Sequence, residues 1–268
     1  MGSESPYVEG LIMAKNVAVS AEKNVSVFDD LVEFMDADSG KGVSQSADDN
    51  IVPLIYVLQA LSPQVSKRNP EYVEGAEPGD LLKKNSIHSP LVKGEEGTIF
   101  QPCYFEKLWL EWRPNRGGFA GMHQQRPSDA VEVEEIVEGK PRRMWKRSNG
   151  NQVVETRQHI GYADGEPYVI PLASSGHTVS RTWMQMMNQM FIPGTSKIAP
   201  SFAKKYKLTT VEKSNEKGTW FVLKVEDAGW VNKEEYVRGK GLHEAFARGE
   251  KKAAAMEEHQ SSDDSVPF

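Results

Sequence analysis

The sequence predicts a mainly β fold with helical additions, of the α+β class, in which short strands form a small, partly open barrel. Three observations predict it. Segments rich in β-branched and aromatic residues recur between residues 51 and 228, separated by turn residues. One amphipathic helical pattern, Val179–Phe191, is inserted among them, and the polar residues 256–268 predict a disordered acidic tail. The number of strands alone would also allow an α+β sandwich.

The predicted strands follow one another along the middle of the chain. Ile51–Leu58 is a β-branched run in which Pro53 restricts the segment to a sheet edge or to a strand start. Asp164-Gly165 has the composition of a tight hairpin turn. The further segments with strand composition are 99–113, 131–137, 153–162, 168–172 and 220–225.

Two segments have helical patterns. The apolar residues of Val179–Phe191 share one face at helical spacing, which indicates core packing rather than a ligand site. Pro193-Gly194 lies just beyond this helix and is expected to end it. Lys233–Glu258, rich in alanine and charge, is predicted to be a second helical segment.

Composition limits the class of protein. The chain has 268 residues, a formal net charge of −6, 26% charged residues and a mean hydropathy of −0.54, which suit a water-soluble protein with a packed core. No apolar run reaches the ~20 residues that a membrane helix needs, and the first residues lack the basic segment of a signal peptide. Cys103 is the only cysteine, which excludes a disulfide framework. We therefore expect a cytoplasmic protein that does not associate with membranes.

Charge divides the chain into segments. Residues 1–50 carry ten acids and three bases, and residues 256–268 carry four acids and no base, so the remainder has a net charge of +5. A basic middle can bind phosphate while the acidic ends compete for it, although acidic ends can also serve solubility alone. The predicted organisation is an acidic appendage at 1–50, a β-rich core at 51–228, a helical segment at 229–255 and an acidic tail at 256–268.

The common catalytic and metal-binding patterns are missing from the sequence. Neither glycine-rich phosphate motif occurs between a strand and a helix. The six histidines are scattered without metal-ligand spacing, and one cysteine cannot build a thiolate zinc site. Cys103 lies in an apolar segment, where a buried, unreactive thiol is expected. We expect no catalytic residue, no metal and no cofactor, and hence a protein that is not an enzyme.

The predicted strand 104–113 combines cations with aromatic rings, the side chains that bind the phosphates and stack on the bases of single strands. Alternation places Leu108, Leu110 and Trp112 on a core face. The opposite face would carry Phe105, Lys107, Trp109 and Arg113. The glycine-rich loop that follows adds Arg116 and Phe119. The alternative is a strand buried on both faces, followed by ordinary loop arginines.

Two further segments have the same character. The basic cluster at 140–147 surrounds Trp145 and is flanked by glycines, which predicts an exposed loop or hairpin. Its candidate phosphate contacts are Arg142, Arg143, Lys146 and Arg147, because guanidinium groups in particular suit phosphate and stack on bases. In the predicted strand 220–225, Trp220 and Lys224 lie opposite the core face. The alternative for residues 140–147 is a solvated hairpin, and the alternative for Trp220 is a side chain that covers one end of the barrel.

The last residues place acids before a final hydrophobic side chain and its carboxylate. They are Asp263, Asp264, Val266, Pro267 and Phe268. This end resembles the C-terminal tip of bacterial and phage single-stranded DNA-binding proteins, in which acidic residues lead into a final Pro-Phe. The resemblance implies an OB-like barrel for the core. It also implies that the tail recruits replication, recombination or repair proteins, through capture by an apolar pocket with a basic rim.

Residues 58–119 also resemble uncharacterised phage proteins. The resemblance rests on residues 58–64, residues 75–80, and Trp109–Pro114 with the Gly117-Gly118-Phe119 loop. It implies a phage origin, and hence the cytoplasm of a bacterial host, but no particular activity.

These observations together predict a phage protein that binds and protects single-stranded DNA without strong sequence specificity during DNA replication, recombination or repair. One alternative is a phage protein-interaction module or a DNA-mimicking inhibitor of a host enzyme. Another is a structural component of the virion. A homo-oligomer is compatible with each reading.

Overall fold

We describe a computed structural model of the chain at residues 51–84, 90–114, 117–137, 140–216 and 218–253. The chain divides into two units, residues 1–45 and 46–268, and every described residue belongs to the second. The predicted acidic appendage at 1–50 and the acidic tail at 256–268 therefore lie outside the described residues.

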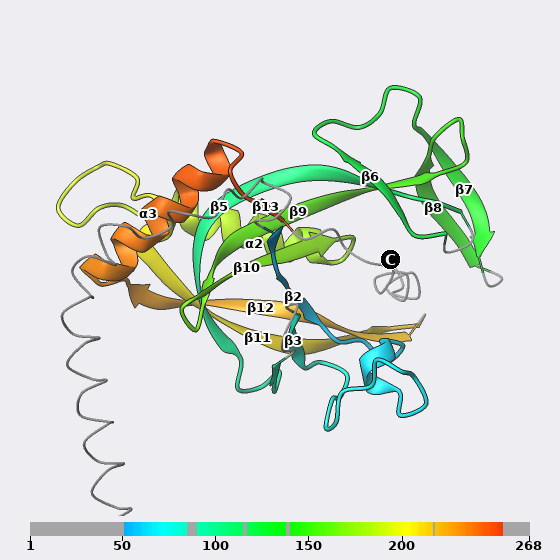
Figure 1. Ribbon diagram of the computed structural model, residues 1–268, viewed down its shortest axis with the longest axis horizontal. Helices are drawn as coiled ribbons and strands as arrows, with labels where there is room; N and C mark the ends of the chain where they lie inside the picture. Colours follow the sequence, from blue (N-terminus) through cyan, green and yellow to red (C-terminus); the bar gives the residue numbers. More distant parts are fainter. Residues whose placement is uncertain (1–50, 85–89, 115–116, 138–139, 217, 254–268) are drawn as a thin grey trace, which may run out of the picture. The chain divides into compact units, whose positions relative to one another are not determined.

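One curled sheet of 11 strands makes up most of the described structure (Figure 1). Neighbouring strands along its main path are antiparallel, except for β10 (Glu166–Ala173) and β2 (Leu54–Val57), which pair in parallel. The mainly β fold with a partly open barrel is thus confirmed. From edge to edge the path runs through β12 (Gly218–Trp230), β11 (Lys204–Asn215), β5 (Thr98–Trp112), β9 (Gln152–Ala163), β10, β2, β3 (Leu81–Lys84) and β4 (Leu91–Val92).

The strands β5 and β9 are long, and their far halves carry a second group of strands beside the barrel (Figure 1). β6 (Phe119–His123) pairs with the last residues of β5. β8 (Lys140–Lys146) pairs with the first residues of β9 and forms a hairpin with β7 (Val131–Val137). The hairpin expected for the basic cluster is therefore present. A separate short pair joins β1 (Ile51–Val52) to β13 (Lys252–Ala253).

The inner face of the sheet, defined as the face that α2 (Gly176–Asn188) covers, holds the largest core. Trp183 and Met187 of α2 are buried there, as the helical spacing predicted. The helix begins and ends three residues earlier than expected. Side chains from six strands surround the two helical residues: Ile55, Leu81, Phe100, Ile170, Tyr206 and Leu223.

No ladder joins β12 to β2 within the described residues. Side chains link the two sides of the barrel at this point instead. Gln59, just after β2, donates from Nε2 to the carbonyl oxygen of Phe221 in β12 (2.9 Å), and its Oε1 accepts from the Phe221 N–H (3.0 Å). Thr210 of β11 donates to the carbonyl oxygen of Gly79 (2.7 Å). A Cβ at Gly94 would lie 2.2 Å from that same oxygen, so the close approach requires glycine.

The outer face carries α3 (Lys233–Ala247), which begins at a capping box between Asn232 and Glu235. Leu242 and Phe246 of this helix share a core with strand residues that include Cys103, so the helical segment and the barrel are packed together. The helix ends well before the predicted Glu258, because Gly249 adopts a positive φ of 71° and the chain then enters β13.

Local turn chemistry fixes the remaining connections. Asp164 and Gly165 both have positive φ, 51° and 85°, which is the geometry of the tight hairpin predicted between β9 and β10. Asp164 also forms an ion pair with the buried Lys83 of β3. Single 3-10 turns occur at η1 (Pro63–Val65) and η2 (Ser201–Ala203).

Candidate nucleic-acid interface

The far half of β5 alternates between the two faces of the sheet as predicted. Leu108 and Leu110 are buried in the outer-face core. Phe105, Lys107 and Trp109 project from the inner face, each opposite a residue of the neighbouring strand β9. These cross-strand pairs, which we call the inner-face row, are Phe105 with His159, Lys107 with Arg157, and Trp109 with Glu155.

Cations from two strands and one helix meet at this row. Lys107 is exposed, and Arg157 pairs with Glu155 (Nε to Oε1, 3.2 Å). His177, in the first turn of α2, donates from Nε2 to the carbonyl oxygen of Glu155 (2.9 Å), which holds the helix against β9. Burial lowers the pKa of His177, and the positive charges of Arg157 and Arg181 lower it further. Arg181 lies one helical turn after His177, and Arg157 lies two residues after Glu155, so the bond between His177 and Glu155 brings the two segments that carry these arginines together. Lys107, Arg157 and Arg181 therefore form one cationic region.

An aromatic cluster lies at one end of the row. Trp145 of β8 meets Trp109 edge to face, with ring centroids 6.1 Å apart. The guanidinium carbon of Arg126 lies 3.8 Å from the Trp145 ring centroid and 5.8 Å from that of Trp109. Trp109 was predicted to stack on bases, but it is only 9% exposed, because the β7–β8 hairpin folds over it. Trp145, which is half-buried, and Arg126, which is exposed, are the accessible members of the cluster.

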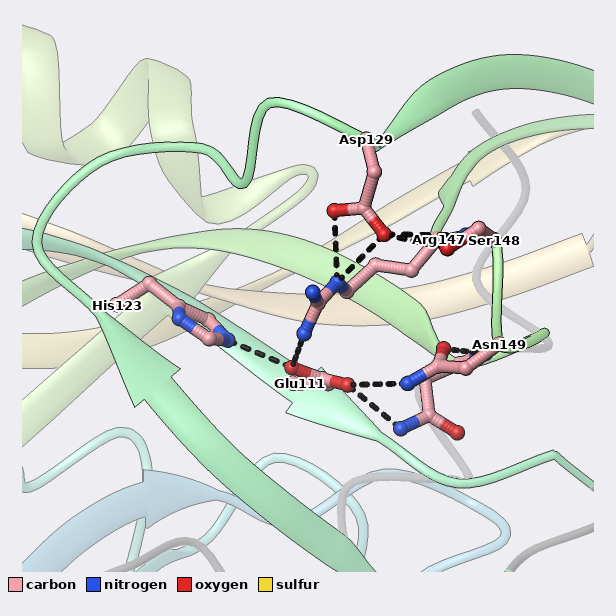
Figure 2. A network of polar contacts seen from close by, with 7 residues as sticks. Glu111, His123, Asp129, Arg147, Ser148 and Asn149 are labelled. Carbon is pink, nitrogen blue, oxygen red and sulfur yellow. Dashed lines mark hydrogen bonds and ion pairs between the residues drawn. The ribbon is translucent and has the colours of Figure 1, made fainter.

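A polar network holds this hairpin in place, as Figure 2 shows. Glu111 of β5 lies at its centre, and its carboxylate accepts hydrogen bonds from four side chains. The donors are His123 Nε2 (2.6 Å), Arg147 (2.8 Å), Asn149 (3.3 Å) and Asn151 (2.6 Å). A carboxylate has about four lone-pair sites, so the network occupies all of them. Glu111 therefore acts as an anchor, joining β5, β6 and the turn between β8 and β9.

The pKa of Glu111 reflects these contacts. Burial of the carboxyl raises the pKa, but the four hydrogen bonds outweigh burial and lower it to about 2. Asp129 extends the network, because it accepts from Arg147 Nε (3.0 Å) and from the Ser148 hydroxyl (2.8 Å). Within the residues that the structure describes, no cluster of His, Cys, Asp or Glu is placed to hold a metal ion.

The basic cluster of β8 differs from the expectation, because acids of β7 and of the network neutralise much of it. Arg143 pairs with Glu134 (3.3 Å), and Lys146 pairs with Glu135 (2.6 Å). Arg142 lies opposite Glu135 in the ladder, and Arg147 is held by Glu111 and Asp129. Antiparallel pairing with β7 thus aligns Arg142 and Arg143 with carboxylates, whereas Lys146 and Arg147 reach theirs through side-chain contacts away from the directly opposite position.

The remaining predicted residues do not join the row. Arg113 is exposed and donates to the carbonyl oxygen of Phe119 (3.0 Å), and Phe119 packs against Trp112 with the outer-face core. Trp220 and Lys224 lie on the edge strand β12, where Lys224 pairs with Glu226 (2.9 Å). β11 separates β12 from the near end of β5, which lies nine residues before Trp109, or about 30 Å along the strand.

Arg116 and the five tail residues, from Asp263 to Phe268, lie outside the described residues. Three arginines that were not predicted as site residues from the sequence lie beside the row: Arg126, Arg157 and Arg181. Arg157 could be found only once the register of β9 against β5 is known, because that register places it opposite Lys107. Neither Arg126 nor Arg181 belongs to a basic cluster in the sequence.

Comparison with known proteins identifies the family. No curated protein and no solved structure matches the chain. No helix in the part of the chain that is described has the length and apolar character needed to cross a membrane. Residues 21–252, which are most of the chain, match the family model of the Pam3 phage gp34-like protein. The chain therefore belongs to the family of Pam3 phage gp34-like proteins.

Proposed function

We propose that this phage protein binds single-stranded DNA across the inner-face row, between Arg126 and Trp145 at one end and Phe105 at the other. The observation that carries the proposal is the gathering of four cations and accessible aromatic rings on one face of β5 and β9. Binding of this kind would protect exposed strands during phage DNA replication, recombination or repair.

Charge on the row supports the proposal. Lys107 and Arg181 are exposed, and neither forms an ion pair within the described part of the chain. Arg157 shares Glu155, the only acid in the row, so cations outnumber carboxylates there. A strand that neutralises its phosphates on these side chains releases counterions, and binding should then weaken steeply with salt.

The aromatic cluster supports binding without sequence specificity. Arg126 covers the Trp145 ring, and a guanidinium plane stacked in this way can itself accept a base on its other side. Stacking on rings and guanidinium planes tolerates every base, because each base has a π face. Trp109 packs edge to face against Trp145, and the Glu111 network fixes the hairpin that carries Trp145.

The test is a fluorescence-polarisation titration of labelled oligo-dT at two salt concentrations, with duplex DNA as competitor. We expect binding that weakens with salt and that duplex DNA fails to displace. Absence of binding at low salt, also after removal of residues 256–268, would refute the proposal.

Matched variants locate the surface. Lys107→Ala/Arg181→Ala removes two cations from the inner face, whereas Lys240→Ala/Arg248→Ala removes two from α3 and its C-cap. Each phosphate contact on a single strand contributes about 0.7 to the slope of log K against log salt. The first double variant should reduce that slope by about 1.4, and the second should leave it unchanged. Equal effects of the two variants would contradict the proposed surface.

A protein-interaction role is the second candidate, and one observation favours it. The loop between α2 and η2 exposes three large apolar side chains, Phe191, Ile192 and Ile198, which are 51%, 38% and 57% exposed. Exposed apolar groups that gather in this way are typical of protein contacts. A folded chain that fails to bind oligo-dT in the titration above would favour this second function.

A further inference from the structure

A cavity of about 170 Å³ lies at the Phe105 end of the inner-face row. It forms where β5 loses its neighbour: β11 pairs with residues 98–100 of β5, and β6 pairs only from Trp109 onward. Beside the intervening stretch, residues of α2 and of the loop that follows it line the cavity together with β5 and β9. The cavity is therefore built from two strands, a helix and a loop.

The lining is neutral and partly polar. Phe105 of β5 and Met184 of α2 supply apolar surface, and Asn188 and Ser201 supply groups that donate or accept hydrogen bonds. No Asp, Glu, Lys or Arg lines the cavity. Such walls suit a flat, uncharged ring with polar edges.

His159 lines this cavity and carries a ring nitrogen without a hydrogen-bond partner among the described residues. The residue is fully buried, lines the cavity and stacks on Trp183, with ring centroids 4.3 Å apart. Its Nε2 bonds to the Ser180 hydroxyl (2.9 Å), whereas Nδ1 is buried and has no partner among the described residues. Burial lowers the pKa of His159 to about 3, so the ring is neutral at physiological pH. An unpaired buried nitrogen costs stability unless a ligand or water bonds to it.

Cations flank the cavity on both sides. Lys107 follows Phe105 on the same face of β5, and Arg181 precedes Met184 and Asn188 on one face of α2, at helical spacing. A neutral cavity between two exposed cations matches the chemistry of a nucleotide, which joins an uncharged base to anionic phosphates.

We infer that this cavity takes one unstacked nucleobase of the bound strand, with its flanking phosphates on Lys107 and Arg181. The inference deepens the proposed single-strand binding and rests on it. The base inserts beside Phe105 and Met184, and its polar edge bonds to Asn188, Ser201 or His159. The open edge of β5 leaves room for the base at this point of the row.

Filling the cavity tests the inference. Ala199 lines the cavity and is 5% exposed, so Ala199→Leu places an isobutyl group in the space. Ser196→Leu is the matched control, because it introduces the same side chain on the same loop at an exposed position that does not line the cavity. Loss of one stacked base should weaken oligo-dT binding about tenfold in the first variant, and the second should bind as the wild type does. Asn188→Ala, at the exposed rim of the cavity, is a second variant that does not depend on core packing, with an expected loss of about fivefold.

Cross-linking with oligo-dT that carries 5-iododeoxyuridine identifies the peptides that contact the bases of the bound strand. In the wild type we expect cross-links to peptides that contain Phe105 or Met184, and in Ala199→Leu these should disappear while cross-links near Trp145 persist. Wild-type binding with cross-links only near Trp145, and full affinity in all three variants, would overturn the cavity inference and leave the proposed function intact. Failure of the wild type to bind oligo-dT at all would overturn both.

Discussion

The anchoring role of Glu111 leads to a prediction with a defined magnitude. Glu111→Gln keeps the shape of the side chain but removes the charge, and it presents an amide N–H to a site where four groups already donate. The carboxyl is only 6% exposed, so solvent screens these interactions little.

The pKa of this carboxyl gives the size of the effect. It falls from an ordinary value of 4.5 to about 2 in the folded protein. Because one pKa unit corresponds to about 1.4 kcal/mol, the ionised carboxyl stabilises the folded state by roughly 3 kcal/mol. The pKa is lowered by folding, so this stabilisation is complete above pH 4.5 and is lost as the pH falls toward 2.

Urea denaturation of the full chain at pH 7 and pH 3 measures both features. Glu111→Gln should lower the free energy of unfolding by about 3 kcal/mol at pH 7 and by about 1.4 kcal/mol at pH 3, because part of the wild-type stabilisation has then gone. Glu134→Gln is the matched control on β7. Its carboxyl is 57% exposed, and loss of its pair with Arg143 should cost less than about 1 kcal/mol. A Glu111→Gln deficit below about 1 kcal/mol at pH 7, or one that is equal at the two pH values, would refute the reasoning.

Three further predictions concern single features of the chain. Arg126→Ala uncovers the Trp145 ring, so acrylamide should quench tryptophan fluorescence more strongly and oligo-dT should bind more weakly; unchanged quenching would contradict the contact. Burial raises the pKa of the Cys103 thiol to about 12, so a disulfide reagent at pH 8 should label this residue only after denaturation, and rapid labelling of the native chain would show otherwise. Deletion of residues 256–268 should tighten oligo-dT binding at low salt if the acidic tail competes for the cations, and an unchanged affinity excludes that competition.

Local patterns predicted the parts of this fold that depend on neighbouring residues. The period-2 alternation of β5 placed Lys107 and Trp109 on one face and Leu108 and Leu110 on the other, because strand geometry fixes that alternation whatever the partner is. The tight turn at Asp164-Gly165 and the apolar face of α2 were predictable for the same reason.

Contacts between distant segments could not be predicted in this way. Trp109 is buried because a hairpin that begins more than 20 residues later folds over it. Arg142 and Arg143 of β8 lie next to carboxylates, because the ladder register aligns them with Glu135 and Glu134 of β7. Arg181 reaches the row only through the packing of α2 against β9. Each of these facts requires the register or the packing angle, which one sequence does not contain.

The bridge that the Gln59 side-chain amide forms to the backbone of Phe221 determines where the barrel can open. The two strands that this bridge links keep their own antiparallel partners, β11 for β12 and β3 for β2, whether or not the bridge is formed. Two hydrogen bonds from one side chain, between residues 162 positions apart, are the direct polar link found across the seam at this point. Widening of the barrel between β12 and β2 therefore breaks no ladder: it breaks these two hydrogen bonds, the bond from Thr210 to Gly79 and side-chain contacts of the core. Such a local opening would widen the interior, while the ladder hydrogen bonds between neighbouring strands continue to hold the sheet together.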